Sequence, residues 1–165
     1  MRRIAVIDST PLISLAHLEL ATELVHFFDV IYVPSAVQRE VNRKQKFRYR
    51  LNKLYKRGVF QKCASADELS VELLKAELDA GEAEALIQAQ ERNAHYFVGD
   101  EKRARKIGEA LGLKPVGTVR ILARLNLESR AAETKSLVRK LRRDLLFRVS
   151  DQVVDQAIAS ATEAI

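Results

Sequence analysis

Three short apolar runs, separated from one another by helical segments, constrain most strongly what this chain can fold into. Residues 4–7 and 30–33 are continuous apolar stretches of the kind found in central strands of parallel sheets, and residues 96–98 form the third. Residues 59–60 and 114–116 are shorter extended candidates. This alternation of strands and helices predicts an α/β fold, in which a short parallel sheet of about four to five strands is flanked by helices on both faces.

Helical patterns account for most of the remaining chain, and Ser35 and Ser150 are the expected N-caps of two of the helices. Helices are predicted from Ser9, at 36–43, in the basic stretch up to a break near Gly58, from Asp67 or Ser70, and at 82–92, 102–110, 119–125, 133–143 and 151–163. The 165 residues contain no linker and no internal repeat. We therefore expect one domain, residues 1–165, on which the C-terminal helices of residues 133–163 pack.

The charge balance points to a polyanionic partner. The net charge is +6 and the sequence pI is about 9.6, which favours nucleic acid over a membrane surface. Nine Lys or Arg residues and no acid lie between Arg43 and Lys62, and Phe47, Tyr49 and Tyr55 are interleaved with them. Cations with aromatic residues suit phosphate contact and base stacking, whereas the alternative interpretation is a solvated, basic helix face.

Other partners and compartments are disfavoured. The single cysteine, Cys63, excludes an intrachain disulfide and a cysteine-based metal cage. No apolar stretch approaches the roughly 20 residues that span a bilayer. The first residues carry two arginines followed by an apolar run that Asp8 interrupts at once, unlike a signal peptide. We expect a cytoplasmic protein with no membrane partner.

Four carboxylates are the candidate site. Asp8 ends the first strand and Asp100 follows the third, while Glu40 and Glu82 lie in helices that turn toward the same sheet edge. The carboxyl ends of parallel strands are where ligands and catalytic groups collect. Carboxylates gathered there without basic partners would repel one another, and burial would raise their pKa values, but a divalent cation removes that conflict.

Each acid also has an ordinary structural interpretation. Asp8 would serve as a helix cap, Glu40 as a solvent-facing acid, and Glu82 as an acid favoured by the dipole at a helix start. Asp100 would pair with the cations that follow it. Asp79 and Glu84 compete with Glu82 for its role.

The missing motifs narrow the chemistry. No GxGxxG, GxxxxGK[ST] or GxSxG occurs, and His17, His26 and His95 lack metal-ligand spacing. What remains is oxygen chemistry, because hard cations such as Mg²⁺ and Mn²⁺ prefer carboxylate and water ligands. A metal-bound water at the sheet edge could attack a phosphodiester in line while a second ion stabilises the leaving oxygen, which needs no protein nucleophile.

Four acidic motifs in this order resemble those of a PIN-domain nuclease, specifically the compact prokaryotic type related to VapC toxins. The matching segments are residues 6–13, residues 33–37 continuing to Glu40 and Val41, residues 81–85, and residues 97–101 with 111–118 beyond them. The resemblance covers most of the chain. It implies a PIN-like three-layer fold and an endoribonuclease dependent on Mg²⁺ or Mn²⁺, often the toxin of a type II toxin–antitoxin pair and often a homodimer.

Carried over by position, the resemblance makes Asp8, Glu40, Glu82 and Asp100 the metal-binding catalytic acids. Glu101 would be an additional ligand. Ser9 and Thr118 supply hydroxyls that could orient a carboxylate or a water around the metal.

The leading hypothesis is a metal-dependent ribonuclease that cuts unpaired RNA, whose bases are free to stack. Tyr49 or Phe47 would stack a base, and an antitoxin protein is a candidate partner. The residues expected to hold RNA phosphates are Arg48, Arg50, Lys53, Lys102, Arg103 and Arg105. One alternative is a non-catalytic RNA- or protein-binding module on the same fold. Another is a receiver-like phosphoacceptor, which also has aspartates at strand ends.

Overall fold

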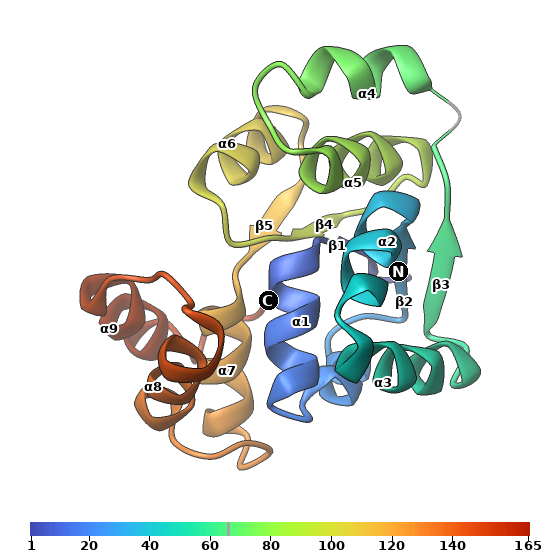
Figure 1. Ribbon diagram of the computed structural model, residues 1–165. Coiled ribbons are helices and arrows are strands. Elements are labelled where there is room, and N and C mark those ends of the chain that lie inside the picture. The colour runs from blue at the N-terminus through green and yellow to red at the C-terminus, as the bar shows by residue number, and fades with distance from the viewer. Residues whose placement is uncertain (66) are drawn as a thin grey trace.

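One all-parallel sheet organises the protein, whose computed structural model describes residues 1–65 and 67–165 (Figure 1). Its strand order is β3-β2-β1-β4-β5. The strands are β1 (Ile4–Ile7), β2 (Val30–Pro34), β3 (Phe60–Cys63), β4 (Tyr96–Val98) and β5 (Lys114–Val116). The predicted α/β class and the parallel sheet of four to five strands are therefore confirmed.

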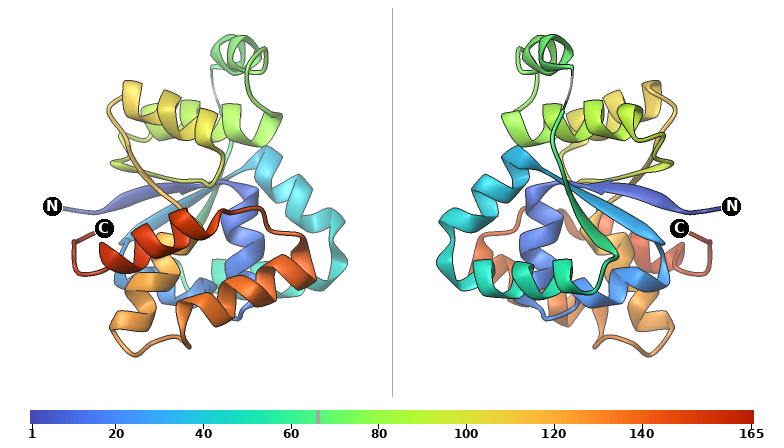
Figure 2. Two further views of the ribbon diagram at one scale, coloured as in Figure 1. Left: turned by 90° about the vertical axis from the view of Figure 1, so that its left-hand side faces the viewer. Right: turned by 90° about the vertical axis from the view of Figure 1, so that its right-hand side faces the viewer.

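Helices cover both faces of the sheet and make three layers. They are α1 (Ser9–His17), the short 3-10 helix η1 (Ala21–His26), α2 (Ser35–Arg43), α3 (Gln45–Lys56), α4 (Glu68–Leu74), α5 (Ala80–Glu91), α6 (Lys102–Ala110), α7 (Thr118–Leu127), α8 (Thr134–Leu145) and α9 (Asp151–Ala159). The two side views place α4, α5 and α6 on one face and α1, α3, α7, α8 and α9 on the other (Figure 2).

The central strand shows why the apolar runs carried so strong a signal. Successive side chains of a strand point to opposite faces, so Ala5 and Ile7 join the larger hydrophobic cluster, beside α1 and α7. Val6 joins the smaller cluster under α5 and α6, where it packs with Leu86 and Phe97. Both faces of β1 are buried, which explains its continuous rather than alternating apolar pattern.

The two C-terminal helices share the larger cluster. Val138 and Leu141 of α8, together with Val154 and Ala157 of α9, are buried in it. Ser150 is the N-cap of α9, as expected, and its hydroxyl accepts a hydrogen bond of 3.3 Å from the Val153 N–H. Among the described residues, no helix has the length and apolar character needed to cross a membrane.

Several predicted boundaries are wrong by a residue or more, and one error has a tertiary cause. Ser35 was expected to cap a helix starting at Ala36, but α2 begins at Ser35 with Pro34 as its N-cap. The Glu84 carboxylate of α5 accepts hydrogen bonds from the N–H groups of Ser35 (3.2 Å) and Ala36 (2.7 Å). A carboxylate 49 residues away thus takes the role that a local side chain usually fills.

The middle of the chain differs from prediction in two places and agrees with it in two others. β3 covers residues 60–63 rather than 59–60, and α5 begins at Ala80 rather than Glu82. The break near Gly58 is confirmed, since α3 ends at Lys56 and Gly58 has φ +78°. Asp67 rather than Ser70 caps α4, accepting a hydrogen bond of 3.0 Å from the Ser70 N–H.

Candidate functional site

The sheet topology places the two strand-end aspartates next to each other. The chain runs outward from β1 through β2 to β3 on one side and then crosses over to β4 and β5 on the other. The strand order therefore reverses between β1 and β4, which pair directly, and crevices at such switch points are the usual ligand sites of open α/β sheets. Asp8 follows β1 and Asp100 follows β4, so both lie at this crevice.

An acidic cavity of about 350 Å³ opens at this edge of the sheet. Five carboxylates line it: Glu40, Asp79, Glu82, Asp100 and Glu101. The remaining wall comes from α1, from Lys44, from the last residue of α8 and from residues 146–148, which follow that helix. The structure thus brings three of the four predicted catalytic acids to one cavity, together with Glu101 and with Asp79, whose role the sequence left open.

Asp8, the fourth acid, is only 3% exposed and is coupled electrostatically to the cavity acids. Burial raises its pKa from 3.8 to about 8, and repulsion from Asp79, Glu82 and Glu40 acts in the same direction. A hydrogen bond from the backbone of Ser9 opposes the rise. Within the described chain its Oδ1 atom is buried without a hydrogen-bond partner. A buried acceptor left unpaired is costly, so this oxygen is poised for a ligand.

The backbone at the start of α5 approaches this unpaired oxygen closely. A Cβ atom on Gly81 would lie 3.2 Å from Asp8 Oδ1 and 3.4 Å from Asp79 Oδ1, so glycine allows the approach. Asp79 and Glu82 form a capping box, in which the Glu82 N–H donates to Asp79 Oδ1 (2.9 Å) and the Asp79 N–H donates to Glu82 Oε2 (3.1 Å). Burial, followed by repulsion from neighbouring acids, raises the pKa of Glu82.

Asp100 is held by the first residue of α7. The Thr118 N–H donates to its Oδ1 atom (2.7 Å) and the Thr118 hydroxyl donates to its Oδ2 atom (2.6 Å). Burial raises the pKa of Asp100, while these hydrogen bonds and the nearby Arg105 guanidinium act to lower it. Gly117 leaves room for this arrangement, because a Cβ there would lie 3.2 Å from Asp100 Oδ1 and 3.3 Å from Arg105 Nη1.

The cavity suits a hard cation in its donor type but not in its present geometry. Carboxylate oxygens are the ligands that Mg²⁺ and Mn²⁺ prefer, and the unpaired Asp8 oxygen is an available donor. However, no three Asp, Glu, His or Cys side chains in residues 1–65 and 67–165 converge closely enough to hold a metal ion. The acids would have to move inward to share one.

The other predicted residues are placed unevenly. Ser9 is buried at the start of α1, next to Asp8, and Glu84 is engaged at the start of α2 rather than in the cavity. Phe47 is only 1% exposed, so the expectation that it stacks an RNA base is wrong. Its ring packs in the core, because α3 buries one face against the sheet, whereas Tyr49 is exposed with Lys53 Nζ 4.6 Å from its ring centroid.

The predicted phosphate-binding cations fall into two groups on opposite layers, α3 and α6 (Figure 1). On α3, Arg48 and Lys53 are exposed, but Arg50 donates to the carbonyl of Ala16 (2.6 Å) at the end of α1. On α6, Lys102 is exposed and Arg103 pairs with Glu77 (2.8 Å), while Arg105 lies beside Asp100.

Sequence reasoning missed the segment between α8 and α9. Leu146, Phe147 and Arg148 line the acidic cavity although they lie more than 40 residues from any of its acids along the chain. No local pattern marks them, apart from the isolated Arg148 after three apolar residues. Their position depends on how α8 and α9 pack against α7.

The fold and cavity define a three-layer α/β protein with acidic residues at the switch point of its sheet. A family model described as a PIN domain matches residues 4–163, and the chain belongs to that family. A search of curated proteins found no match. Family membership confirms the resemblance to PIN domains and indicates a nuclease-type function in general.

Proposed function

We propose that this protein is an endoribonuclease that hydrolyses RNA phosphodiester bonds with the help of Mg²⁺ or Mn²⁺. The observation that carries the proposal is the buried, unpaired carboxylate oxygen of Asp8, placed at the sheet's switch point among Glu40, Asp79 and Glu82. An enzyme that relied on proton transfer alone would not need five carboxylates around one cavity. The net charge of +6 supports a nucleic acid as substrate.

Asp8, Glu40, Glu82 and Asp100 would hold the cation, with Glu101 as an additional ligand. The ion would supply Lewis-acid polarisation of the phosphate and an activated water. Thr118 fixes the orientation of Asp100 through its two hydrogen bonds. Because its pKa is raised to about 8, Asp8 carries a proton near neutral pH and must release it when it becomes a ligand.

Cations around the cavity would position the RNA. Lys44 and Arg148 line the acidic cavity itself and suit the phosphate that is cut. The predicted set (Arg48, Arg50, Lys53, Lys102, Arg103 and Arg105) lies on α3 and α6 and would supply further phosphate contacts. Within it, the exposed Arg48, Lys53 and Lys102 are the best placed for a ligand, and Tyr49 offers an exposed ring for stacking.

Cleavage of a mixed RNA pool tests the proposal. Purified protein should cut with Mg²⁺ or Mn²⁺ and not with EDTA, and Asp8→Asn and Asp100→Asn should each abolish cutting. Asp155→Asn is the matched control, since it removes an exposed carboxylate on α9 outside the cavity. Wild-type cleavage by either cavity variant would show that the acids are wrongly assigned.

We further propose that the protein is the toxin of a type II toxin–antitoxin pair, acting in the cytoplasm as a homodimer. The support is the resemblance of its four motifs to compact prokaryotic PIN proteins. Induced expression in a bacterial host should stop growth, and Asp8→Asn should restore it. Normal growth with the wild-type protein, at a level of expression that cleaves RNA in extracts, would argue against a toxin.

A non-catalytic RNA-binding module is the second candidate, and the exposed Tyr49 and Lys53 pair on α3 favours it. Such a protein would bind unpaired RNA without cutting it. Its affinity would be the same in EDTA and in Mg²⁺, and Asp8→Asn would not change it.

A further inference from the structure

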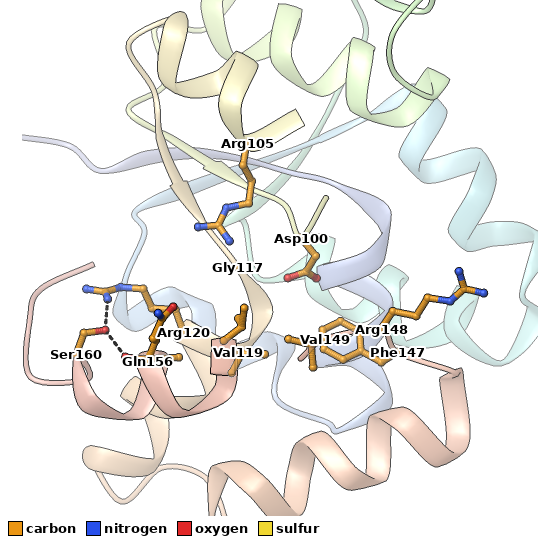
Figure 3. Close-up of a pocket in the computed structure, with 12 residues that line it drawn as sticks. Asp100, Arg105, Gly117, Val119, Arg120, Phe147, Arg148, Val149, Gln156 and Ser160 are labelled. Atoms are coloured by element: carbon orange, nitrogen blue, oxygen red, sulfur yellow. Dashed lines mark hydrogen bonds between the residues drawn. The ribbon is translucent and has the colours of Figure 1, made fainter. Parts of the chain in front are cut away.

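A second pocket adjoins the acidic cavity on the far side of Asp100. Its volume is about 250 Å³, and it lies between α7, α9 and the segment that joins α8 to α9 (Figure 3). Asp100, Phe147 and Arg148 line both hollows, so the two form one trough that passes Asp100. We refer to this second hollow as the side pocket.

The side pocket differs in character from the acidic cavity. Phe147, Val149 and Val153 give it an apolar wall, and Asp100 is its only acid among the described lining residues. Arg105 reaches in from α6, and its guanidinium makes no hydrogen bond or ion pair with any side chain that the structure describes. The Gln156 side chain on α9 also has no partner within the described residues and is exposed.

Of the three arginines that line the side pocket, Arg120 is bound to other residues, whereas Arg105 and Arg148 are available to bind a ligand. Arg120 donates to the Ser160 hydroxyl (2.8 Å) and pairs with Glu163 (3.5 Å), so it holds the C-terminal segment against α7. Arg148 is exposed, has no ion pair among the described residues, and extends away from Arg105 in the close-up (Figure 3). Arg105 and Arg148 therefore flank Asp100 from two sides.

An RNA strand bound in the acidic cavity needs an adjoining site with positive charge for its next phosphate. The phosphate next to the one being cut would meet carboxylates if it stayed in that cavity, and like charges repel. Arg105 offers that phosphate a planar, charge-assisted donor, and the apolar wall offers a base a surface on which to pack. The side pocket, at about 250 Å³, lies just below the usual range of ligand pockets (roughly 300–1,000 Å³), so its occupant is limited to a single nucleotide.

We propose that the side pocket binds the nucleotide adjoining the scissile phosphate, with Arg105 on its phosphate, Phe147 and Val153 against its base, and Gln156 hydrogen-bonded to base or ribose. The proposal rests on the ribonuclease function proposed above. It makes the segment between α8 and α9 a determinant of which nucleotide is accepted beside the cut.

The test is a titration with adenosine 5′-monophosphate and with uridine 5′-monophosphate in EDTA, followed by NMR of backbone amides and methyl groups. Binding should shift the signals of Gly117, Val153 and Ala157, which line the side pocket. Arg105→Gln should weaken the binding of either monophosphate about tenfold, the usual effect of losing a charged hydrogen bond, and leave adenosine binding unchanged.

A second variant guards against an indirect effect of Arg105 on Asp100. Val153 is 42% exposed at the pocket rim, so Val153→Trp should fill the pocket without disturbing the core and should abolish binding of both nucleotide and nucleoside. Arg139→Gln is the control, because Arg139 is an exposed arginine of α8 outside the side pocket.

Three outcomes would overturn the proposal: shifts confined to other surfaces, an unchanged affinity in Arg105→Gln and Val153→Trp, or inorganic phosphate shifting the same signals as strongly as the nucleotides. The last would show an anion site without nucleoside recognition. Since EDTA prevents cleavage, the titration gives its answer whether or not the protein cuts RNA. A failure of the proposed function would appear separately, as absence of metal-dependent cleavage by the wild-type protein.

Discussion

The stability of metal-free Asp8→Asn, measured relative to the wild type, should increase as the pH rises. Burial raises the pKa of Asp8 from 3.8 to about 8, so the folded state holds a proton that the unfolded chain releases above about pH 4. The contribution of Asp8 to stability therefore falls as the pH rises from 3.8 to about 8 and is constant above that range. One unit corresponds to about 1.4 kcal/mol, so wild-type stability should fall by about 3 kcal/mol between pH 5 and pH 7.5 through this group alone.

An asparagine side chain is neutral throughout this range and removes that dependence. It leaves a polar atom at the position of the unpaired Oδ1, so the cost of about 1–3 kcal/mol for that atom is common to the variant and the wild type. At pH 5, where the buried Asp8 of the wild type is also neutral, the two proteins should therefore have similar stability. The free energy of unfolding of the variant relative to the wild type should rise by about 3 kcal/mol between pH 5 and pH 7.5.

Urea unfolding followed by circular dichroism, in EDTA at several pH values, measures this difference. Asp155→Asn should show no comparable trend, because its carboxylate is exposed. A difference between Asp8→Asn and wild type that stays constant from pH 5 to pH 7.5 would refute the idea that Asp8 is buried with a raised pKa. Millimolar Mn²⁺ should reverse the order at pH 7.5, because a cation that binds the folded wild-type site stabilises it and not the variant.

Further substitutions at four residues test the contacts of the site, of α2 and of α3. Thr118→Val should lower stability by about 1–2 kcal/mol and slow cleavage, because Asp100 loses a hydroxyl donor. Thr118→Ser keeps that donor and should restore both stability and cleavage, so equal cleavage by the two variants would contradict a role of the hydroxyl in holding Asp100. Glu84→Ala removes the cap of α2, which should cost about 1–2 kcal/mol and lower the melting temperature. The Mn²⁺ affinity measured by calorimetry should not change, and its loss would show that Glu84 belongs to the metal site. Lys53→Gln should reduce the slope of log affinity for RNA against log salt by about 0.7. Arg50→Gln should mainly lower the unfolding free energy, because Arg50 donates to the Ala16 carbonyl. The reverse pattern would assign the phosphate contact to Arg50.

Local patterns were enough to predict the class of fold and the strands that carry the site. Apolar runs such as residues 4–7 mark buried parallel strands because both faces of such strands are covered, and this property is visible in a few consecutive residues. The positions of Asp8 and Asp100 at strand ends follow from the same runs. The resemblance of the surrounding motifs to PIN domains is likewise a property of short segments, and the family match confirms it.

The group with which each charged residue pairs depends on contacts between segments that are far apart in the sequence. Glu82 and Glu84 lie only two residues apart on α5, yet the Glu84 carboxylate caps α2 and Glu82 lines the acidic cavity. The two acids differ in this way because the start of α5 packs against α2 and also borders the cavity. Arg50 resembles its basic neighbours in sequence, but the end of α1 lies within reach of its guanidinium.

The sequence by itself therefore determined the α/β order, the parallel sheet and the acids at its strand ends, since these depend on periodicity and on short motifs. Only the tertiary structure decided that Asp8 is buried with an oxygen left unpaired among the described residues, that Asp79 joins the cavity, and that Phe147 and Arg148 line both the cavity and the side pocket. The physical reason is range. Hydrophobic patterning acts over a few residues, whereas desolvation, charge repulsion and hydrogen bonding depend on which distant groups the packed fold brings together.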